Sequence, residues 1–148
     1  MQTFLPYPDF LKSAQCLDNK RLGKQRVEAL QILRIITGED SNSRWKNHPA
    51  VRMWRGYADA LANYTIIICK VWSDKGYEDS CKLKVYKLIS KRYEPDNFDV
   101  WKDGRVPFWL GTSAFHLAHQ SNLVRKMPEH YRQYFPNIPD DLPYIWPV

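Results

Sequence analysis

Residues 49–76 read PAVRMWRGYADALANYTIIICKVWSDKG, and their apolar side chains recur at helical spacing. In steps of three and four, the recurring positions are Val51, Trp54, Ala58, Leu61, Thr65, Ile68 and Trp72. This spacing places them on one face of a helix. Pro49 suits a first helical position, where no N–H is needed, and Gly76 suits the end. The stretch therefore predicts one long helix that faces the core.

A second long helix is predicted to run to about Thr37, capped by Ser13 or Asp18 and stopped by Gly38. Its apolar row consists of Leu22, Arg26, Ala29, Leu33 and Ile36. Arg26 is a charge on that row and needs a partner. Gly23, one turn earlier, costs the helix about 0.5–1 kcal/mol relative to alanine, so it indicates a close approach by a ligand or a neighbouring helix.

The other segments predict shorter elements. They are an extended arm over 1–12, a polar loop over 38–47, a helical or partly extended basic segment over 81–93, a loop over 93–111, helices over 113–126 and 128–135, and an extended tail over 136–148 with four prolines. The expected fold is mainly α, a single compact domain (1–148) of two long core helices, shorter helices, loops and an extended aromatic and proline-rich C-terminal tail.

The composition favours a polyanionic partner. The 148 residues include 22 Lys and Arg against 16 Asp and Glu, which gives a net charge of +6 and a pI near 9.2. Nucleic acid is the first expectation and an acidic membrane surface the second. The 6 Trp, 9 Tyr and 6 Phe exceed what a core of this size requires, and aromatic rings on a basic surface suit base stacking.

The sequence does not have the patterns of a disulfide-bonded or zinc-binding domain, a membrane-spanning protein, or an enzyme with a common nucleotide, redox or hydrolase motif. Cys16, Cys69 and Cys81 lack metal-ligand spacing and indicate reduced thiols. The longest apolar run, four residues within 65–69, falls far short of the roughly 20 that span a membrane, and no signal peptide is visible. Phosphate-binding glycine loops, CxxC pairs and GxSxG are absent. The protein is expected in the cytoplasm, associated with nucleoid or viral DNA, and not secreted.

Two stretches combine cations with aromatic rings. WKNHP at 45–49 precedes a helix whose N-terminus favours phosphate, although Trp45 could instead belong to the core. RKMPEHYRQYF at 125–135 interleaves cations with rings, which suits an exposed strand or an anchored tail. His116 and His119 lie one turn apart, but two imidazoles without a third ligand such as His130 do not make a metal site. A polar groove or a phosphate contact is the preferred interpretation.

Four stretches together resemble a known family, in the same order through nearly the whole chain. They are LDNKRLGKQRV at 17–27, KNHPAVRMW at 46–54, FHLAHQSNLVRK at 115–126, and HYRQYFP followed by PYIWP near the end. The chain is similar to the pyrimidine-dimer DNA glycosylase (phage endonuclease V-like) family, as a divergent bacterial or viral relative.

The resemblance implies an N-glycosylase with associated abasic-site lyase activity. An amine attacks C1′ of the damaged nucleotide, the base leaves, and the resulting imine allows strand cleavage by β-elimination. The implied partner is double-stranded DNA with a damaged or modified pyrimidine, first of all an ultraviolet dimer, bound by a monomer without cofactor or metal. Such a base must be unstacked, which agrees with the aromatic content.

An α-amine is the expected nucleophile, because its reference pKa of about 7.7–8.0 leaves more neutral amine near pH 7 than the lysine value of about 10.4. Gln2 is large, and removal of an initiator methionine normally requires a small second residue. Met1 and Gln2 are therefore the candidate catalytic positions at this end, with the amine on Met1, and Lys20 or Lys24 are the alternatives.

The family's essential glutamate falls on Gly23 in this sequence. Glu28 from a shifted register, Asp9 or Asp18 could replace it, or the acid step is lost. Arg26 matches a family arginine near the scissile nucleotide and is taken as catalytic with Glu28. We expect Arg26 to point into a DNA-lined groove, with Gly23 leaving space beside it.

Further residues are expected to contact DNA, by resemblance or by their charge and aromaticity. They are Arg21, Lys24, Gln25, Trp45, Lys46, Asn47, His48, Arg52, His116, His119, Arg125, Lys126, Tyr131 and Tyr134.

Three alternatives stay open. The chain could be a non-catalytic DNA-binding module on the same scaffold, a glycosylase for a non-dimer modified base, or a structural or partner-binding protein whose basic face is only solvated. Steep salt dependence of DNA binding separates the last from the others. Covalent trapping separates the enzymes from the module.

Overall fold

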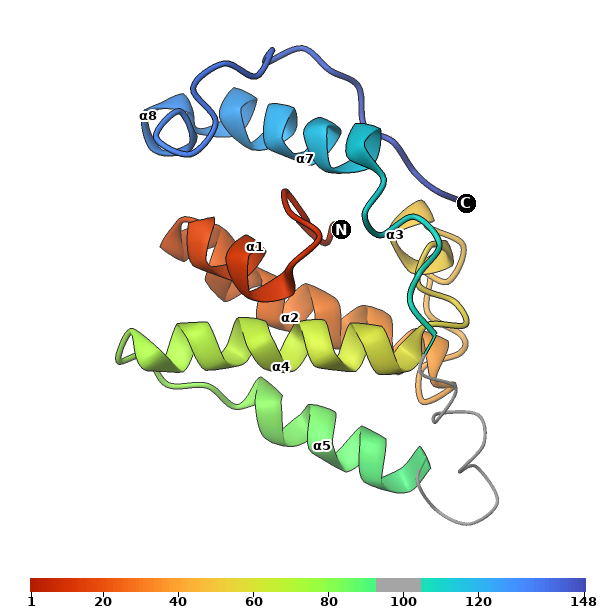
Figure 1. The fold of residues 1–148 in the computed structure, drawn as a ribbon. Coiled ribbons are helices and arrows are strands. Elements are labelled where there is room, and N and C mark those ends of the chain that lie inside the picture. Colours follow the sequence, from red (N-terminus) through yellow and green to blue (C-terminus); the bar gives the residue numbers. More distant parts are fainter. Residues whose placement is uncertain (93–104) are drawn as a thin grey trace.

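The computed structural model describes residues 1–92 and 105–148, and its regular elements in those ranges are all helices. Two long helices, α2 (Asn19–Ile36) and α4 (Ala58–Asp74), pack along each other in the centre (Figure 1). Their facing rows are apolar, and burial of those rows drives the packing. The predicted mainly helical fold with two long core helices is confirmed.

The long helix that was predicted to run to about Thr37 is preceded by a separate short helix. Asp9 caps α1 (Phe10–Cys16) by accepting a hydrogen bond from the Lys12 N–H, and Asp18 caps α2 by accepting one from the Arg21 N–H. Leu17 between them is extended, so the helix cannot continue. Asp18 was one of the two expected caps, whereas residues 10–12, the start of α1, were wrongly assigned to the extended arm because that start depends on a single aspartate cap.

The long helix predicted over 49–76 is also interrupted. Pro49 opens only α3 (Pro49–Arg52), and Gly56, with φ of +84°, turns the chain before α4 begins. Only glycine adopts that backbone readily. The apolar period survives the break, because Val51, Trp54, Leu61, Thr65 and Ile68 are buried on both sides of it.

The remaining elements lie where they were predicted, except that the helix predicted over 128–135 ends at Tyr131. They are α5 (Cys81–Arg92), α7 (Ser113–Lys126), α8 (Pro128–Tyr131) and an extended C-terminal tail. The predicted loop over 93–111 lies mostly outside the described residues. Within the described ranges no helix has both the length and the apolar composition needed to cross a membrane.

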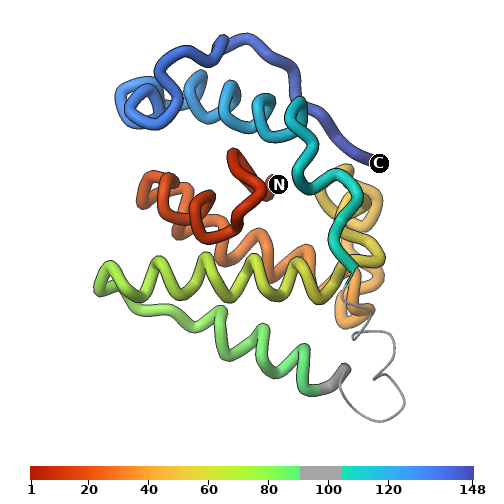
Figure 2. The backbone as a smooth tube through the Cα atoms, viewed as in Figure 1, coloured from red at the N-terminus to blue at the C-terminus, as the bar shows by residue number. Residues whose placement is uncertain are grey.

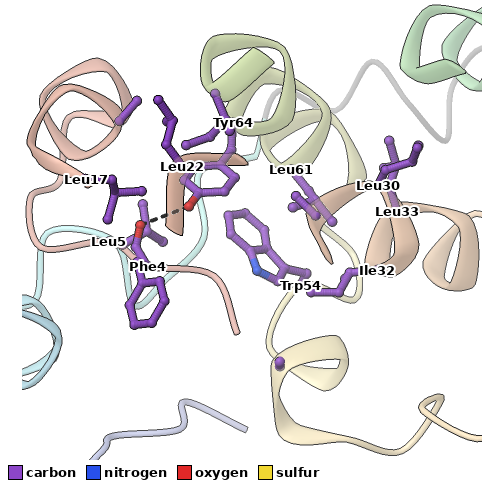
Figure 3. Close-up of a cluster of buried hydrophobic side chains, with 14 of the residues drawn as sticks. Phe4, Leu5, Leu17, Leu22, Leu30, Ile32, Leu33, Trp54, Leu61 and Tyr64 are labelled. Carbon is purple, nitrogen blue, oxygen red and sulfur yellow. Dashed lines mark hydrogen bonds between the residues drawn. The ribbon is translucent and has the colours of Figure 1, made fainter. Parts of the chain in front are cut away.

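Aromatic side chains fill the centre of the core. Trp54 is fully buried next to Tyr64 and Leu61 (Figure 3), and its indole N–H donates to the Thr3 hydroxyl at 3.0 Å. Trp109 packs edge-on against Trp54 with ring centroids 4.9 Å apart, and its N–H donates to the Met53 carbonyl. Each buried indole therefore has the partner that burial demands.

From here on, the word arm means residues 2–5, a shorter segment than the one predicted over 1–12. These residues are extended and buried between α7 on one side and α1 with α2 on the other (Figures 1 and 2). The arm belongs to no sheet, so side chains must satisfy its backbone. All four of its N–H groups donate to side chains, those of Glu28, Gln2, Gln25 and His119 in chain order. The arm is thus fixed by polar side chains that point into the core.

Two histidines of α7 hold Leu5 of the arm. The Leu5 N–H donates to Nδ1 of His119 at 3.0 Å, and the Leu5 carbonyl lies 2.8 Å from Nδ1 of His116. Nε2 of His116 accepts from the Gly111 N–H, so both rings serve in their neutral form. Burial lowers the pKa of His116, and burial together with His116 lowers the pKa of His119 to about 3.

We predict that the free energy of unfolding falls on acidification below pH 6.5. A buried histidine whose pKa is depressed stays neutral when folded and binds a proton when unfolded, so its stabilisation is complete above about pH 6.5 and decreases toward pH 3. Each such histidine contributes a slope of up to about 1.4 kcal/mol per pH unit. Urea unfolding between pH 6.5 and 5 measures this slope, and His119→Gln should flatten it. Parallel curves for the two proteins contradict the assignment.

Candidate DNA-binding and catalytic site

An open hollow of about 430 Å³ lies where the chain's first residues meet α2 and the C-terminal tail. Its volume is within the range of small-ligand sites. The lining residues are Met1, Gln2, Phe4, Lys20, Arg21, Lys24, Gln25, Glu28, Lys126, Tyr144 and Trp146. The structure thus brings the predicted catalytic positions Met1, Gln2 and Glu28 together with four of the expected DNA contacts.

Glu28 is the carboxylate of the hollow. Its Oε2 accepts from the Gln2 N–H and from Nε2 of Gln25, each at 3.3 Å, and its Oε1 lies 3.6 Å from Nζ of Lys24. The side chain is 15% exposed, so it is held in place yet reachable from solvent. A carboxylate in this position can accept or return a proton beside residue 1.

Four cations line the same hollow. Lys20, Lys24 and Lys126 are exposed, and Arg21 is half-buried, where its guanidinium donates to Asp18 at 3.2 Å. Among the lining residues that the structure describes, Glu28 is the single carboxylate. The excess of positive charge favours a phosphate-bearing ligand.

Aromatic rings form one wall of the hollow. Tyr144 and Trp146 stack with centroids 5.5 Å apart and planes 23° apart, and Trp146 meets His48 edge-on. Burial, and secondly the charge of the chain's α-amine, lower the pKa of His48. Tyr144 and Trp146 were missed from the sequence. Their spacing of two on an extended segment, which places both rings on one side, was the available signal.

WKNHP at 45–49 is a capped helix start. Nδ1 of His48 accepts from the Ala50 N–H at 3.0 Å, and the ring of half-buried Trp45 lies under the guanidinium of Arg44. Lys46, Asn47 and Arg52 are exposed around it but do not line the hollow. Their expected contact with DNA stays a prediction.

Four predicted DNA contacts are corrected, because their side chains are buried. Gln25, His116 and His119 bond to the backbone of the arm, and the Tyr131 hydroxyl bonds to Asp18. Burial of polar groups requires these partners, and of these four residues Gln25 alone also lines the hollow. Their polarity suggested a groove, but it serves the arm and a helix cap.

Two further predictions concern the C-terminal part. Arg125 is exposed, but its guanidinium donates to Asn122 and to the carbonyls of Asp140 and Leu142, so it fixes the tail on α7. Arg125 thus has a structural role, and its expected contact with DNA stays a prediction. Tyr134 is 42% exposed and lies away from the hollow, next to Phe135.

Arg26 has a different partner from the one expected. Its Nη1 donates to Oδ1 of Asp79 at 2.7 Å, and its guanidinium lies over the ring of Trp72, 4.5 Å from the centroid. A Cβ on Gly23 would come within 2.9 Å of Trp72, so the missing side chain makes room for this ring. Arg26 does not line the hollow. Arg26 and Glu28 lie on different faces of α2, and the expectation that Arg26 points into a DNA-lined groove stays a prediction.

A family model described as pyrimidine dimer DNA glycosylase matches residues 1–85. The chain belongs to this family. The match covers more than half of the chain and includes the arm, α2 with Glu28, and α4. This pyrimidine dimer DNA glycosylase family member is thus a DNA repair glycosylase that acts on DNA. Comparisons with individual curated proteins and with solved structures found no match.

The family match and the hollow overlap only in part. Met1, Lys24 and Glu28 lie inside the matched residues, whereas Lys126, Tyr144 and Trp146 lie beyond them. In this glycosylase the carboxylate and the amines of residue 1, Lys20 and Lys24 therefore come from the matched part, whereas the amine of Lys126 and the aromatic wall come from the C-terminal part.

We predict that Arg26→Met lowers the free energy of unfolding by about 3–5 kcal/mol, because it leaves the buried carboxylate of Asp79 unpaired. DNA affinity should not change, because Arg26 is outside the hollow.

Lys24→Met is the matched control on the same helix, with a side chain that is 72% exposed. It should weaken DNA binding and leave stability within about 0.5 kcal/mol. Urea unfolding and fluorescence anisotropy with a labelled duplex measure both. Equal losses of affinity in the two variants would restore Arg26 to the DNA contacts.

Proposed function

We propose that the protein is a bifunctional N-glycosylase and abasic-site lyase that excises a damaged pyrimidine, with the ultraviolet dimer as first substrate. The supporting observation is the hollow in which residue 1, Glu28 and four cations meet. A glycosylase of this kind needs an amine, a group that moves protons, and donors for phosphate. All three are within one open site on a chain of this family.

The chemistry begins with the neutral amine of residue 1. Its lone pair forms a bond to C1′, and the N-glycosidic bond breaks with its electron pair on the departing base. The amine loses protons, the sugar ring opens at O4′, and an imine joins residue 1 to C1′. Removal of a C2′ proton then expels the 3′ phosphate by β-elimination and cleaves the strand. Glu28 is the group proposed to accept and return the protons.

Glu28 is better placed than the other candidate carboxylates. Asp9 lies at the start of α1, where it caps that helix. Asp18 caps α2 and is engaged by the hydroxyl of Tyr131 and the guanidinium of Arg21. Neither lines the hollow. The shifted-register alternative is therefore the one that the geometry supports.

Lys20 and Lys24 remain the alternative nucleophiles, because they line the hollow with residue 1. Both are exposed, as suits side chains that contact the phosphates of a bound duplex. We assign them to phosphate binding together with Lys126, and the aromatic wall to the unstacked nucleotide. The N–H of residue 2 donates to Glu28 at 3.3 Å, which supports the proposal that the amine of residue 1 works together with this carboxylate.

We predict that the protein cleaves duplexes carrying one thymine dimer or one abasic site, and that Glu28→Gln slows single-turnover cleavage of the dimer duplex about 10²–10⁴-fold, the usual contribution of general acid–base catalysis. The neutral amide keeps the size of Glu28, so duplex affinity should be retained. Gel analysis of end-labelled strands measures the rate, and anisotropy measures the affinity.

Glu39→Gln is the control, because it makes the same change on an exposed glutamate paired with Arg34. It should cleave like the wild type. Full activity of Glu28→Gln contradicts the role of Glu28. Salt-sensitive binding without cleavage of either duplex favours the non-catalytic DNA-binding module, and cleavage of the abasic duplex alone favours a different base as substrate.

A further inference from the structure

Gln25 is 1% exposed, and every hydrogen-bonding capacity of its side-chain amide is used. Its Oε1 accepts from the Phe4 N–H at 2.9 Å and from the Tyr64 hydroxyl at 2.7 Å. Its Nε2 donates to the Gln2 carbonyl at 2.9 Å and to Oε2 of Glu28 at 3.3 Å. A primary amide has two acceptor sites and two donors, so none is left for DNA.

The partners also fix which way the amide points. The Phe4 N–H can only donate, so the atom facing it must be Oε1, and Nε2 must then face the Gln2 carbonyl and Glu28. The single proton of the Tyr64 hydroxyl is shared between Oε1 of Gln25, at 2.7 Å, and the Phe4 carbonyl, at 2.9 Å (Figure 3), so the orientation of the amide rests on the backbone partners. One side chain thus contacts the arm on both sides of Thr3 and the carboxylate of Glu28 at once.

We propose that Gln25 is a positioning residue that sets the distance between the amine of residue 1 and the carboxylate of Glu28. The inference rests on the proposed function of these two groups. The arm carries residue 1, and its carbonyl at Gln2 and N–H at Phe4 are both bound to Gln25. Glu28, one helical turn further along α2, is bound to the same amide nitrogen. Amine and carboxylate therefore share one rigid reference point.

Other residue types fail at this position for a specific reason. A glutamate accepts from Phe4 but lacks the N–H groups for the Gln2 carbonyl, and it sets a second negative charge beside Glu28. A methionine has similar length and no hydrogen bonds of this kind, so it leaves both the arm and Glu28 without this partner. Gln25→Glu therefore removes only the N–H donors of the side chain, whereas Gln25→Met removes both the donors and the acceptor.

The test uses Gln25→Met and Gln25→Glu in the full chain, with single-turnover cleavage at saturating protein, duplex affinity, and amide hydrogen exchange of residues 2–5. We expect Gln25→Met to slow cleavage about 10²-fold, the effect of misplacing reacting groups by about 1 Å, without loss of affinity. Its arm amides should exchange faster, while those of α4 do not change. Gln25→Glu should slow cleavage but keep the Phe4 amide protected, because that acceptor remains.

Gln31 is the matched control, since it lies on the same helix about 9 Å further along and takes the same substitutions. A role in stability alone would lower the melting temperature of Gln25→Met and leave the rate of the folded protein at the wild-type value, which overturns the proposal. Tyr64→Phe removes a single hydroxyl and should slow cleavage in the same direction, so it serves where the Gln25 variants do not fold.

The hydrogen-exchange measurement can be made whether or not the protein cleaves DNA. Unchanged exchange of residues 2–5 in Gln25→Met overturns the positioning role even if the wild type cleaves DNA. An inactive wild type whose arm amides are released by Gln25→Met contradicts the proposed function and leaves the hold of Gln25 on the arm supported.

Discussion

The backbone of a buried, extended arm must be satisfied without a sheet, and this constraint determines much of the molecule. Four consecutive N–H groups of the arm take side-chain acceptors from Glu28, Gln2, Gln25 and His119. Leaving such groups unpaired in the core would cost about 1–3 kcal/mol each. The core-facing sides of α2 and α7 therefore carry polar residues that an ordinary packed interface would not need. The same bonds hold the start of the chain over α2, beside its carboxylate.

The sequence predicted the parts of the fold that depend on period and on local caps. The apolar rows of α2 and α4, the cap at Asp18 and the opening of α3 at Pro49 are properties of a few neighbouring residues. The break at Gly56 was not predicted, because the apolar period continues through it and a positive φ leaves no trace in that period. The start of α1 depends on the single cap at Asp9, which a proline-broken segment obscured.

The sequence predicted those site residues whose role follows from their own charge or from the resemblance to the family. Residue 1, Lys24, Glu28 and Lys126 follow from charge and resemblance, and they meet in the hollow. The partner of Arg26 was not predictable, because a helical row shows which side a charge faces but not that Asp79, 53 positions later, pairs with it. Buried polar residues were misread for a related reason. A glutamine or histidine that binds backbone in the core has the same letter as one that binds DNA, and the arm that needs them is distant in sequence.

The most direct measurement is the identity of the residue joined to DNA when borohydride reduces the imine on an abasic duplex. The trapped protein is digested, and mass spectrometry locates the sugar remnant. Because the arm holds residue 1 over α2, near Glu28, we predict that the remnant lies on the α-amine of the first residue. The remnant should have the same location in Lys20→Arg and Lys24→Arg. A remnant on Lys20 or Lys24, or trapping that is lost in one of these variants, would contradict the assignment of the α-amine as nucleophile.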